Sequence, residues 1–110
     1  MYREMTLLQR RDSYLKCKYG ISIEDYQKLN ADQGGVCFIC GRPPKTRSLH
    51  VDHIHTKGYK KFPPEQKRNY VRGLLCFQCN KLLMGRGMTQ SKAERIVEYL
   101  QRYLDDQVFV

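Results

Sequence analysis

Two Cys-x-x-Cys pairs, Cys37-Phe38-Ile39-Cys40 and Cys76-Phe77-Gln78-Cys79, bracket the run His50-Val51-Asp52-His53-Ile54-His55. A closed, structural zinc site uses four protein ligands in a tetrahedron. Each Cys-x-x-Cys pair, called a knuckle below, supplies two sulfur ligands, so the two knuckles supply all four. The pairs therefore predict a zinc site that brings the two ends of this segment together. A mixed site, built from the first pair and two of the histidines, ranks below it because the second pair would then have no role.

The composition favours one small domain with a polyanionic partner. Of the 110 residues, 41% are apolar, and 20 Lys and Arg against 11 Asp and Glu give a net charge of +9. Such a balance favours nucleic acid or an acidic membrane surface as partner. No apolar run approaches the roughly 18 residues of a membrane span, and the charged N-terminus has no signal-peptide core. We therefore expect no membrane partner and a location in the cytoplasm of a bacterial or phage-infected cell.

Helical patterns occupy both ends of the chain. Residues 1–19 predict a basic helix that Gly20 ends, with an apolar stripe of Leu7, Leu8, Tyr14 and Leu15. A second helix is predicted from the N-cap Ser22, with Asp25 completing a capping box, to Asp32. A last helix is predicted to start near Ser91, where Ser91 and Glu94 form another capping box. Its apolar face, expected to pack in the core or in a dimer, comprises Ala93, Ile96, Val97, Leu100, Tyr103 and Leu104.

The segment between the two knuckles predicts a hairpin. Residues 49–54 alternate in polarity as a strand does, and residues 70–75 form the returning strand. The polar stretch 56–69 is predicted to be a long hairpin-type loop, and residues 77–84 favour a helix. Cys17 lies far from both knuckles. Because five cysteines in a reducing compartment favour metal ligation over disulfides, this odd one is expected to be a buried free thiol.

Closed zinc sites do not catalyse, so the polar residues between the knuckles need another role. In a regular strand Asp52 and His53 point to opposite faces, and a shared site requires the strand to end or bend there. Asn80 follows Cys79 directly, and the zinc clamp would bring it towards the ion that Asp52 faces. Oxygen ligands of this kind suit Mg²⁺ or Mn²⁺. The plainer alternative is a set of ordinary polar residues on a solvated hairpin.

Positive charge is concentrated in residues 57–72, where six cations face a single acid, Glu65. Aromatic residues are interleaved with these cations, as expected where side-chain stems pack and charged ends reach phosphates. The alternative is a solvated loop whose charge only aids solubility. The predicted DNA-binding residues are Lys57, Lys60, Lys61, Lys67, Arg68 and Arg72.

The order of motifs resembles that of the recombination endonuclease VII family of HNH nucleases. The motifs are Cys-x-x-Cys, then Val-Asp-His-x-His, then Val-Arg-Gly-Leu-Leu-Cys-x-x-Cys-Asn, and they cover roughly residues 19–85. The resemblance implies an α+β, ββα-metal core around one catalytic ion, braced by the four-Cys zinc site. It assigns Asp52 and Asn80 as ligands of Mg²⁺ or Mn²⁺ and His53 as the general base. His50 and His55 become auxiliary candidates, and Ile54 stands where the family often has a second Asp.

From these patterns we expect a single HNH endonuclease domain, residues 1–110. Its predicted parts are a helical N-terminal part (1–35), a zinc-braced ββα-metal core (36–87) and a C-terminal helix (88–110). The predicted activity is metal-dependent DNA cleavage by a one-metal, histidine-base mechanism with low sequence specificity. The rival prediction is a non-catalytic zinc-ribbon module that binds nucleic acid, and a homodimer is compatible with either.

Overall fold

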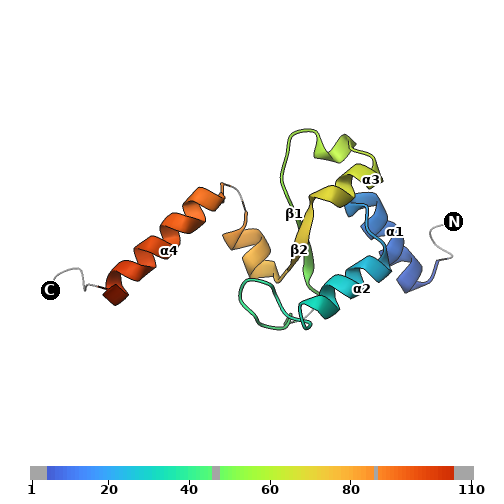
Figure 1. Ribbon diagram of the computed structural model, residues 1–110. Helices are drawn as coiled ribbons and strands as arrows, with labels where there is room; N and C mark the ends of the chain where they lie inside the picture. Colours follow the sequence, from blue (N-terminus) through green and yellow to red (C-terminus); the bar gives the residue numbers. More distant parts are fainter. Residues whose placement is uncertain (1–4, 46–47, 86, 106–110) are drawn as a thin grey trace.

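The computed structural model describes residues 5–45, 48–85 and 87–105. Figure 1 shows a two-stranded sheet between two groups of helices, with the last helix extending away from the rest. The chain is therefore a small α+β protein. It is elongated, with extents of 67, 31 and 20 Å along its principal axes. The elements, in order, are α1 (Leu7–Tyr19), α2 (Ile23–Asp32), β1 (His50–His53), α3 (Pro64–Lys67), β2 (Val71–Leu75) and α4 (Gln90–Asp105).

Helix α1 begins at Leu7 and not at residue 1, where the sequence predicted its start. It begins there because Thr6 caps it. The Thr6 hydroxyl accepts a hydrogen bond from the Gln9 amide, and the Gln9 side chain accepts one from the Thr6 amide. The left-handed conformation of Gly20 ends the helix, as predicted. Residues 1–4 of the predicted helix lie outside the described residues. The predicted apolar stripe is wrong except at Leu15, because Leu7, Leu8 and Tyr14 are exposed.

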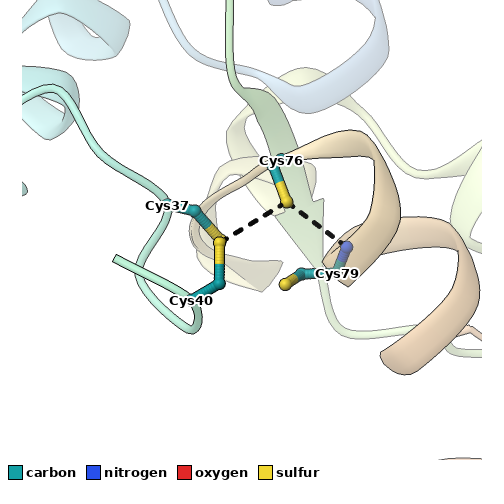
Figure 2. Close-up of side chains that lie close together, drawn as sticks. All are labelled: Cys37, Cys40, Cys76 and Cys79. Atoms are coloured by element: carbon teal, nitrogen blue, oxygen red, sulfur yellow. Dashed lines mark hydrogen bonds between the residues drawn. The ribbon is translucent and has the colours of Figure 1, made fainter. Parts of the chain in front are cut away.

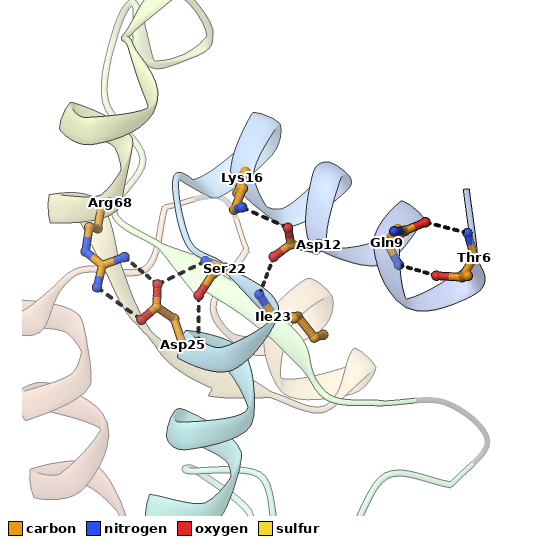
Figure 3. Close-up of polar contacts among 8 residues, drawn as sticks. All are labelled: Thr6, Gln9, Asp12, Lys16, Ser22, Ile23, Asp25 and Arg68. Carbon is orange, nitrogen blue, oxygen red and sulfur yellow. Dashed lines mark hydrogen bonds and ion pairs between the residues drawn. The ribbon is translucent and has the colours of Figure 1, made fainter. Parts of the chain in front are cut away.

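Helix α2 starts with the predicted capping box, in which Ser22 and Asp25 exchange side-chain and backbone hydrogen bonds (Figure 3). The Asp25 carboxylate also accepts both arms of the Arg68 guanidinium, and this pairing lowers the pKa of Asp25 below its usual value. On the buried side of α2, the Tyr26 hydroxyl donates to the Leu49 carbonyl at 2.6 Å. Helix α2 is thereby tied both to the start of the hairpin and to the segment that precedes its second strand.

The sheet is one antiparallel pair, β1 with β2, at the two segments where strands were predicted. A β-bulge interrupts its register between Asp52 and His53. Gln33 fastens α2 to β2, because its side-chain amide donates to the Leu74 carbonyl and accepts from the Leu74 amide, both at 2.9 Å. The buried core of the described residues comprises Leu15, Ile21, Ile23, Tyr26, Cys37, Leu49, Val51, Leu74, Leu75 and Cys79.

The segment predicted as a loop, residues 56–69, contains helical structure. It holds the short helix α3 and two 3-10 turns, Tyr59–Lys61 and Arg68–Tyr70. Pro64 opens α3 at a position where the missing amide hydrogen costs nothing. The helix predicted after the second knuckle also differs, since its residues Cys79–Leu83 form a π-helical segment. Cys17 is exposed on α1, so the prediction of a buried thiol is wrong.

Helix α4 starts one residue earlier than predicted and leaves the core. The Thr89 hydroxyl accepts the Lys92 amide at 3.1 Å, so Thr89 caps the helix in place of Ser91. Its apolar residues Ile96, Val97 and Leu100 are 43%, 66% and 62% exposed. Packing of this face in the core of the chain is therefore a wrong prediction, and the side chains of Tyr103 and Leu104 lie outside the described residues. Within the described ranges, no helix has the length and apolar character needed to cross a membrane.

Candidate functional site

The four knuckle cysteines converge on one point, as the two Cys-x-x-Cys pairs predicted. Their sulfur atoms all lie within 4.8 Å of one another, and Figure 2 shows the four side chains facing a common centre. Backbone bonds shape the first knuckle, with the Cys37 amide donating to the Arg42 carbonyl and the Gly41 amide donating to the Cys37 carbonyl. No histidine joins this cluster among the described residues, so the mixed Cys/His alternative has no support.

Two thiols of this cluster differ in how readily they lose a proton. The backbone amide of Arg42, and then its side chain, lower the pKa of Cys40 to about 6, which favours the thiolate. Burial raises the pKa of Cys79 to about 12, so without a cation this thiol keeps its proton. A metal ion removes that proton, because coordinated thiols are deprotonated outright. Four sulfurs with no competing oxygen ligand fit a closed, structural zinc site.

Asp52 is the buried carboxylate of the site. It is 5% exposed, and Arg72 binds it with two nitrogens, Nε at 2.8 Å and Nη2 at 3.3 Å from separate carboxylate oxygens. The bulge explains this contact. Asp52 pairs with Gly73 and His53 pairs with Val71, so Arg72 is the extra residue between them. β1 ends at His53, and a strand end at this point is one of the two conditions under which these two side chains can share a site.

His53 lies in an aromatic stack on the half-buried side of the hairpin. Its ring is 4.3 Å from the Tyr59 ring and 4.8 Å from the His55 ring, both nearly parallel to it. The Tyr19 ring lies 5.7 Å away, and the Tyr59 hydroxyl donates to the Lys18 carbonyl at 2.9 Å. Burial, followed by the nearby His55, lowers the pKa of His53 below its usual value. The imidazole is therefore neutral at physiological pH and able to accept a proton.

The remaining predicted site residues lie in two places. His55 is exposed and belongs to the His53 stack, whereas His50 contacts Phe77 with ring centroids 5.9 Å apart. Asn80 is the second residue of the π-helical segment, directly after Cys79 of the cysteine cluster, and its amide donates to the Cys76 carbonyl at 2.9 Å. His50 also lines a groove of about 710 Å³ beside the cluster, together with Cys40, Arg42, Pro43, Pro44, Lys45, Ser48, Cys76, Phe77 and Gln78.

Comparison with protein-family models matches residues 12–102 to the recombination endonuclease VII family, and this range contains the cysteine cluster, Asp52, His53 and Asn80. The chain belongs to this family. Two curated relatives are the "Gene 59 protein" of Mycobacterium phage D29 and the "Gene 59 protein" of Mycobacterium phage L5. The first is 40% identical over 88 residues, which are 79% of this chain and 43% of the relative. The second is 41% identical over 68 residues, 61% of this chain and 35% of the relative.

This member of the endonuclease VII family spans less than half the length of the curated relatives it matches. No solved structure matches it at a significant level.

The six cations predicted to bind DNA in this family member fall into two groups. Arg68 pairs with Asp25, Arg72 pairs with Asp52, and the Lys67 ammonium donates to the Cys17 carbonyl at 3.0 Å. These three therefore also hold the fold together. The other three, Lys57, Lys60 and Lys61, are exposed, and within the described part of the chain their side chains form no hydrogen bond or ion pair.

Three contacts in and around the site are not predicted by the sequence patterns. Gln33 links α2 to β2 and Tyr59 supports the His53 ring, but neither residue carries a motif that announces these contacts. The sequence contains one indication that Arg72 pairs with Asp52. An isolated glycine inside a strand pattern, here Gly73, indicates a bulge, and a bulge redirects the neighbouring side chain.

Proposed function

We propose that this chain is a DNA endonuclease that hydrolyses phosphodiester bonds with the help of one Mg²⁺ or Mn²⁺ ion. The observation that carries the proposal is the β-bulge between Asp52 and His53, in a hairpin clamped by four cysteines, within a chain of the endonuclease VII family. The two strands and the helical turn that follows them occur in the order of a ββα-metal, or HNH, core. In this proposal the cysteine cluster holds zinc and has a purely structural role.

His53 is proposed as the general base. A base must be neutral before it removes a proton from the attacking water, and burial of this imidazole favours the neutral form. The stack with Tyr59 and His55 holds the ring in one orientation. Among the described residues no carboxylate forms a hydrogen bond with His53, so packing supplies the orientation that a carboxylate often provides.

Asp52 and Asn80 are proposed to hold the divalent ion. Their carboxylate and amide oxygens are the hard ligands that Mg²⁺ and Mn²⁺ prefer. The ion, when bound, would supply charge relief on the phosphate and on the departing oxygen. Asn80 is suited to this role because its turn is anchored to the cysteine cluster through the Cys76 carbonyl.

DNA binding is assigned mainly to Lys57, Lys60 and Lys61. These side chains are exposed, and their ammonium groups have no partner among the described residues. Contacts of this kind bind the phosphate backbone, so affinity should fall steeply as salt rises and depend little on sequence. The rival proposal, a non-catalytic zinc-ribbon module, explains the cysteines and the charge. It gives no role to the bulge at Asp52 and His53, and the family match does not favour it.

The proposal is tested by incubating supercoiled plasmid with the purified protein in Mg²⁺ or Mn²⁺. We expect nicked or linear DNA, no product with EDTA, and a loss of at least about hundredfold in rate for His53→Ala, which removes the base. The variant should keep its zinc and its circular dichroism spectrum. Cleavage by His53→Ala at the wild-type rate would contradict the assignment of the base.

A matched control shows that a substitution and a parallel purification do not by themselves remove activity. Gln27 is exposed on α2, far in sequence from the proposed site, so Gln27→Ala purified in parallel should cleave as the unmodified protein does. Repeating the assay on linear, single-stranded and branched duplexes then defines the preferred DNA structure. Absence of metal-dependent cleavage on all of these substrates would favour the zinc-ribbon module.

A further inference from the structure

The Asp52–Arg72 pair joins a buried anion to an exposed cation. The Asp52 side chain is 6% exposed and the Arg72 side chain is 42% exposed. Asp52 is held within the paired part of β1, whereas the guanidinium reaches it from the solvent side. If the pair opens, the arginine is therefore the partner that moves, and the carboxylate stays where it is.

The bulge is what makes this pairing available. In an unbroken antiparallel register Arg72 would lie opposite His53, because Asp52 pairs with Gly73. The slip places both Arg72 and Gly73 against Asp52, and Gly73 has no side chain to compete for the carboxylate. A bulge leaves one residue without its hydrogen bonds in the ladder between the strands. Bulges are over-represented next to active sites, where they redirect a side chain.

We propose that Arg72 is an internal counterion of Asp52 that exchanges with the divalent cation and then binds a DNA phosphate. This inference rests on the proposed function, which assigns Asp52 as a ligand of that cation. A buried carboxylate without a cation is costly, so Arg72 can leave Asp52 only when another cation takes its place. The released guanidinium presents two parallel N–H groups, the geometry that a phosphate accepts.

The exchange of Arg72 for a divalent cation on Asp52 predicts that bound metal raises the affinity for DNA and that bound DNA raises the affinity for metal. If the cation binds Asp52 alone, Arg72 loses its partner. If a DNA phosphate binds Arg72 alone, Asp52 loses its partner. Together they replace both contacts, with the cation on Asp52 and the phosphate on Arg72. Because coupling between two ligands is reciprocal, the factor by which Mn²⁺ raises DNA affinity equals the factor by which DNA raises Mn²⁺ affinity.

Arg68 offers a matched control for the test. It makes the same two-armed contact with a carboxylate, Asp25, and lies four residues before Arg72. Arg68→Met therefore removes the same charge and the same kind of ion pair as Arg72→Met, but leaves Asp52 untouched. The two variants carry the same net charge, so a difference between them in metal binding does not come from net charge.

The experiment measures Mn²⁺ binding to zinc-loaded protein by electron paramagnetic resonance of the free ion. All samples carry His53→Ala to prevent cleavage, and Asp52→Asn defines the background. Arg72→Met should bind Mn²⁺ on the order of tenfold more tightly than the chain with Arg72 intact, and Arg68→Met should agree with that chain within about twofold. The gain in DNA affinity that Mn²⁺ produces should shrink in Arg72→Met alone.

The outcomes separate this inference from the proposed function. Equal Mn²⁺ affinity in Arg72→Met and Arg68→Met overturns the exchange, while the endonuclease proposal stands. Absence of Asp52-dependent Mn²⁺ binding in every variant overturns both. If Arg72→Met loses zinc or fold, Arg72→Lys replaces it. Lysine keeps the charge without the two-armed contact and should also bind Mn²⁺ more tightly, and unchanged affinity there overturns the exchange.

Discussion

At the scale of single residues, orientation of the His53 ring is the quantity on which the proposed chemistry depends most. The ring has no recorded carboxylate partner in the described chain, and it stacks on Tyr59 at 4.3 Å. Tyr59 is itself fixed, because its hydroxyl donates to the Lys18 carbonyl and its ring contacts Tyr70 and Phe62. A residue that a motif search would pass over thus positions the proposed base.

Tyr59→Ala should lower the rate of DNA cleavage roughly tenfold to hundredfold, because a displaced base loses its alignment with the water. Tyr59→Phe keeps the stacking ring and loses only the hydroxyl bond to Lys18, so its rate should stay near that of the unmodified protein. Both rates are measured at saturating DNA, which separates positioning from binding. Equal rates for the alanine and phenylalanine variants would show that the ring does not position His53.

At the scale of elements, the turn between α1 and α2 lies directly against α3. Gly20 has φ of 73°, and a Cβ placed there would lie 2.0 Å from the Pro64 carbonyl oxygen and 2.9 Å from the Arg68 nitrogen. Gly34 has a similar φ of 69°, but a Cβ there would meet nothing within 4 Å. The two glycines share the same backbone requirement and differ only in the space around them.

Gly34→Ala should lower the free energy of unfolding by about 1 kcal/mol, the cost of a left-handed alanine. Gly20→Ala should cost about 2–4 kcal/mol, because α3 must also shift away from the new methyl group. Urea denaturation of the two variants measures the difference. Similar losses for both would mean that α3 does not pack on this turn as described.

At the scale of the whole molecule, the cysteine cluster connects segments that the sequence separates by 36 residues, since Cys40 and Cys76 have sulfurs 3.8 Å apart. The sheet has only two strands, and a hairpin of this size is marginal without further support. The described core is also small for a chain of this length, because α4 contributes no buried residue to it. Bound metal should therefore supply a large share of the stability.

Cys76→Ser, or removal of metal with a strong chelator, should abolish the cooperative thermal unfolding of the protein and release one zinc per chain. Cys17→Ser is the matched control, because this thiol is exposed and outside the cluster, and it should keep both zinc and stability. Zinc content by atomic absorption and unfolding by circular dichroism give the two readouts. A stable, zinc-free Cys76→Ser protein would contradict the structural role of the cluster.

The exposed face of α4 shows where a pattern predicts an element but not its partner. The periodicity of Ile96, Val97 and Leu100 indicates an amphipathic helix, and the helix is present. Periodicity does not specify what covers the apolar face, and among the residues that the structure describes nothing buries Ile96, Val97 or Leu100. A role of this face in a homodimer stays a prediction from the sequence.

Features that depend on near neighbours were predictable from the chain alone. The capping box of Ser22 and Asp25, the glycine stop at Gly20 and the two sulfur knuckles each involve residues within four positions of one another. Such contacts form whenever the local backbone is helical or tightly turned, so their residue types are sufficient to indicate them. The convergence of the two knuckles followed because a tetrahedral metal site needs all four sulfurs.

The pairing of Asp52 with Arg72, the stack on His53 and the exposure of α4 were decided by tertiary structure. Each depends on how segments far apart in the chain meet, and a slip of one residue in the register exchanges the faces of a strand. Which side chain reaches which is set only when burial of the shared core selects one register and one packing.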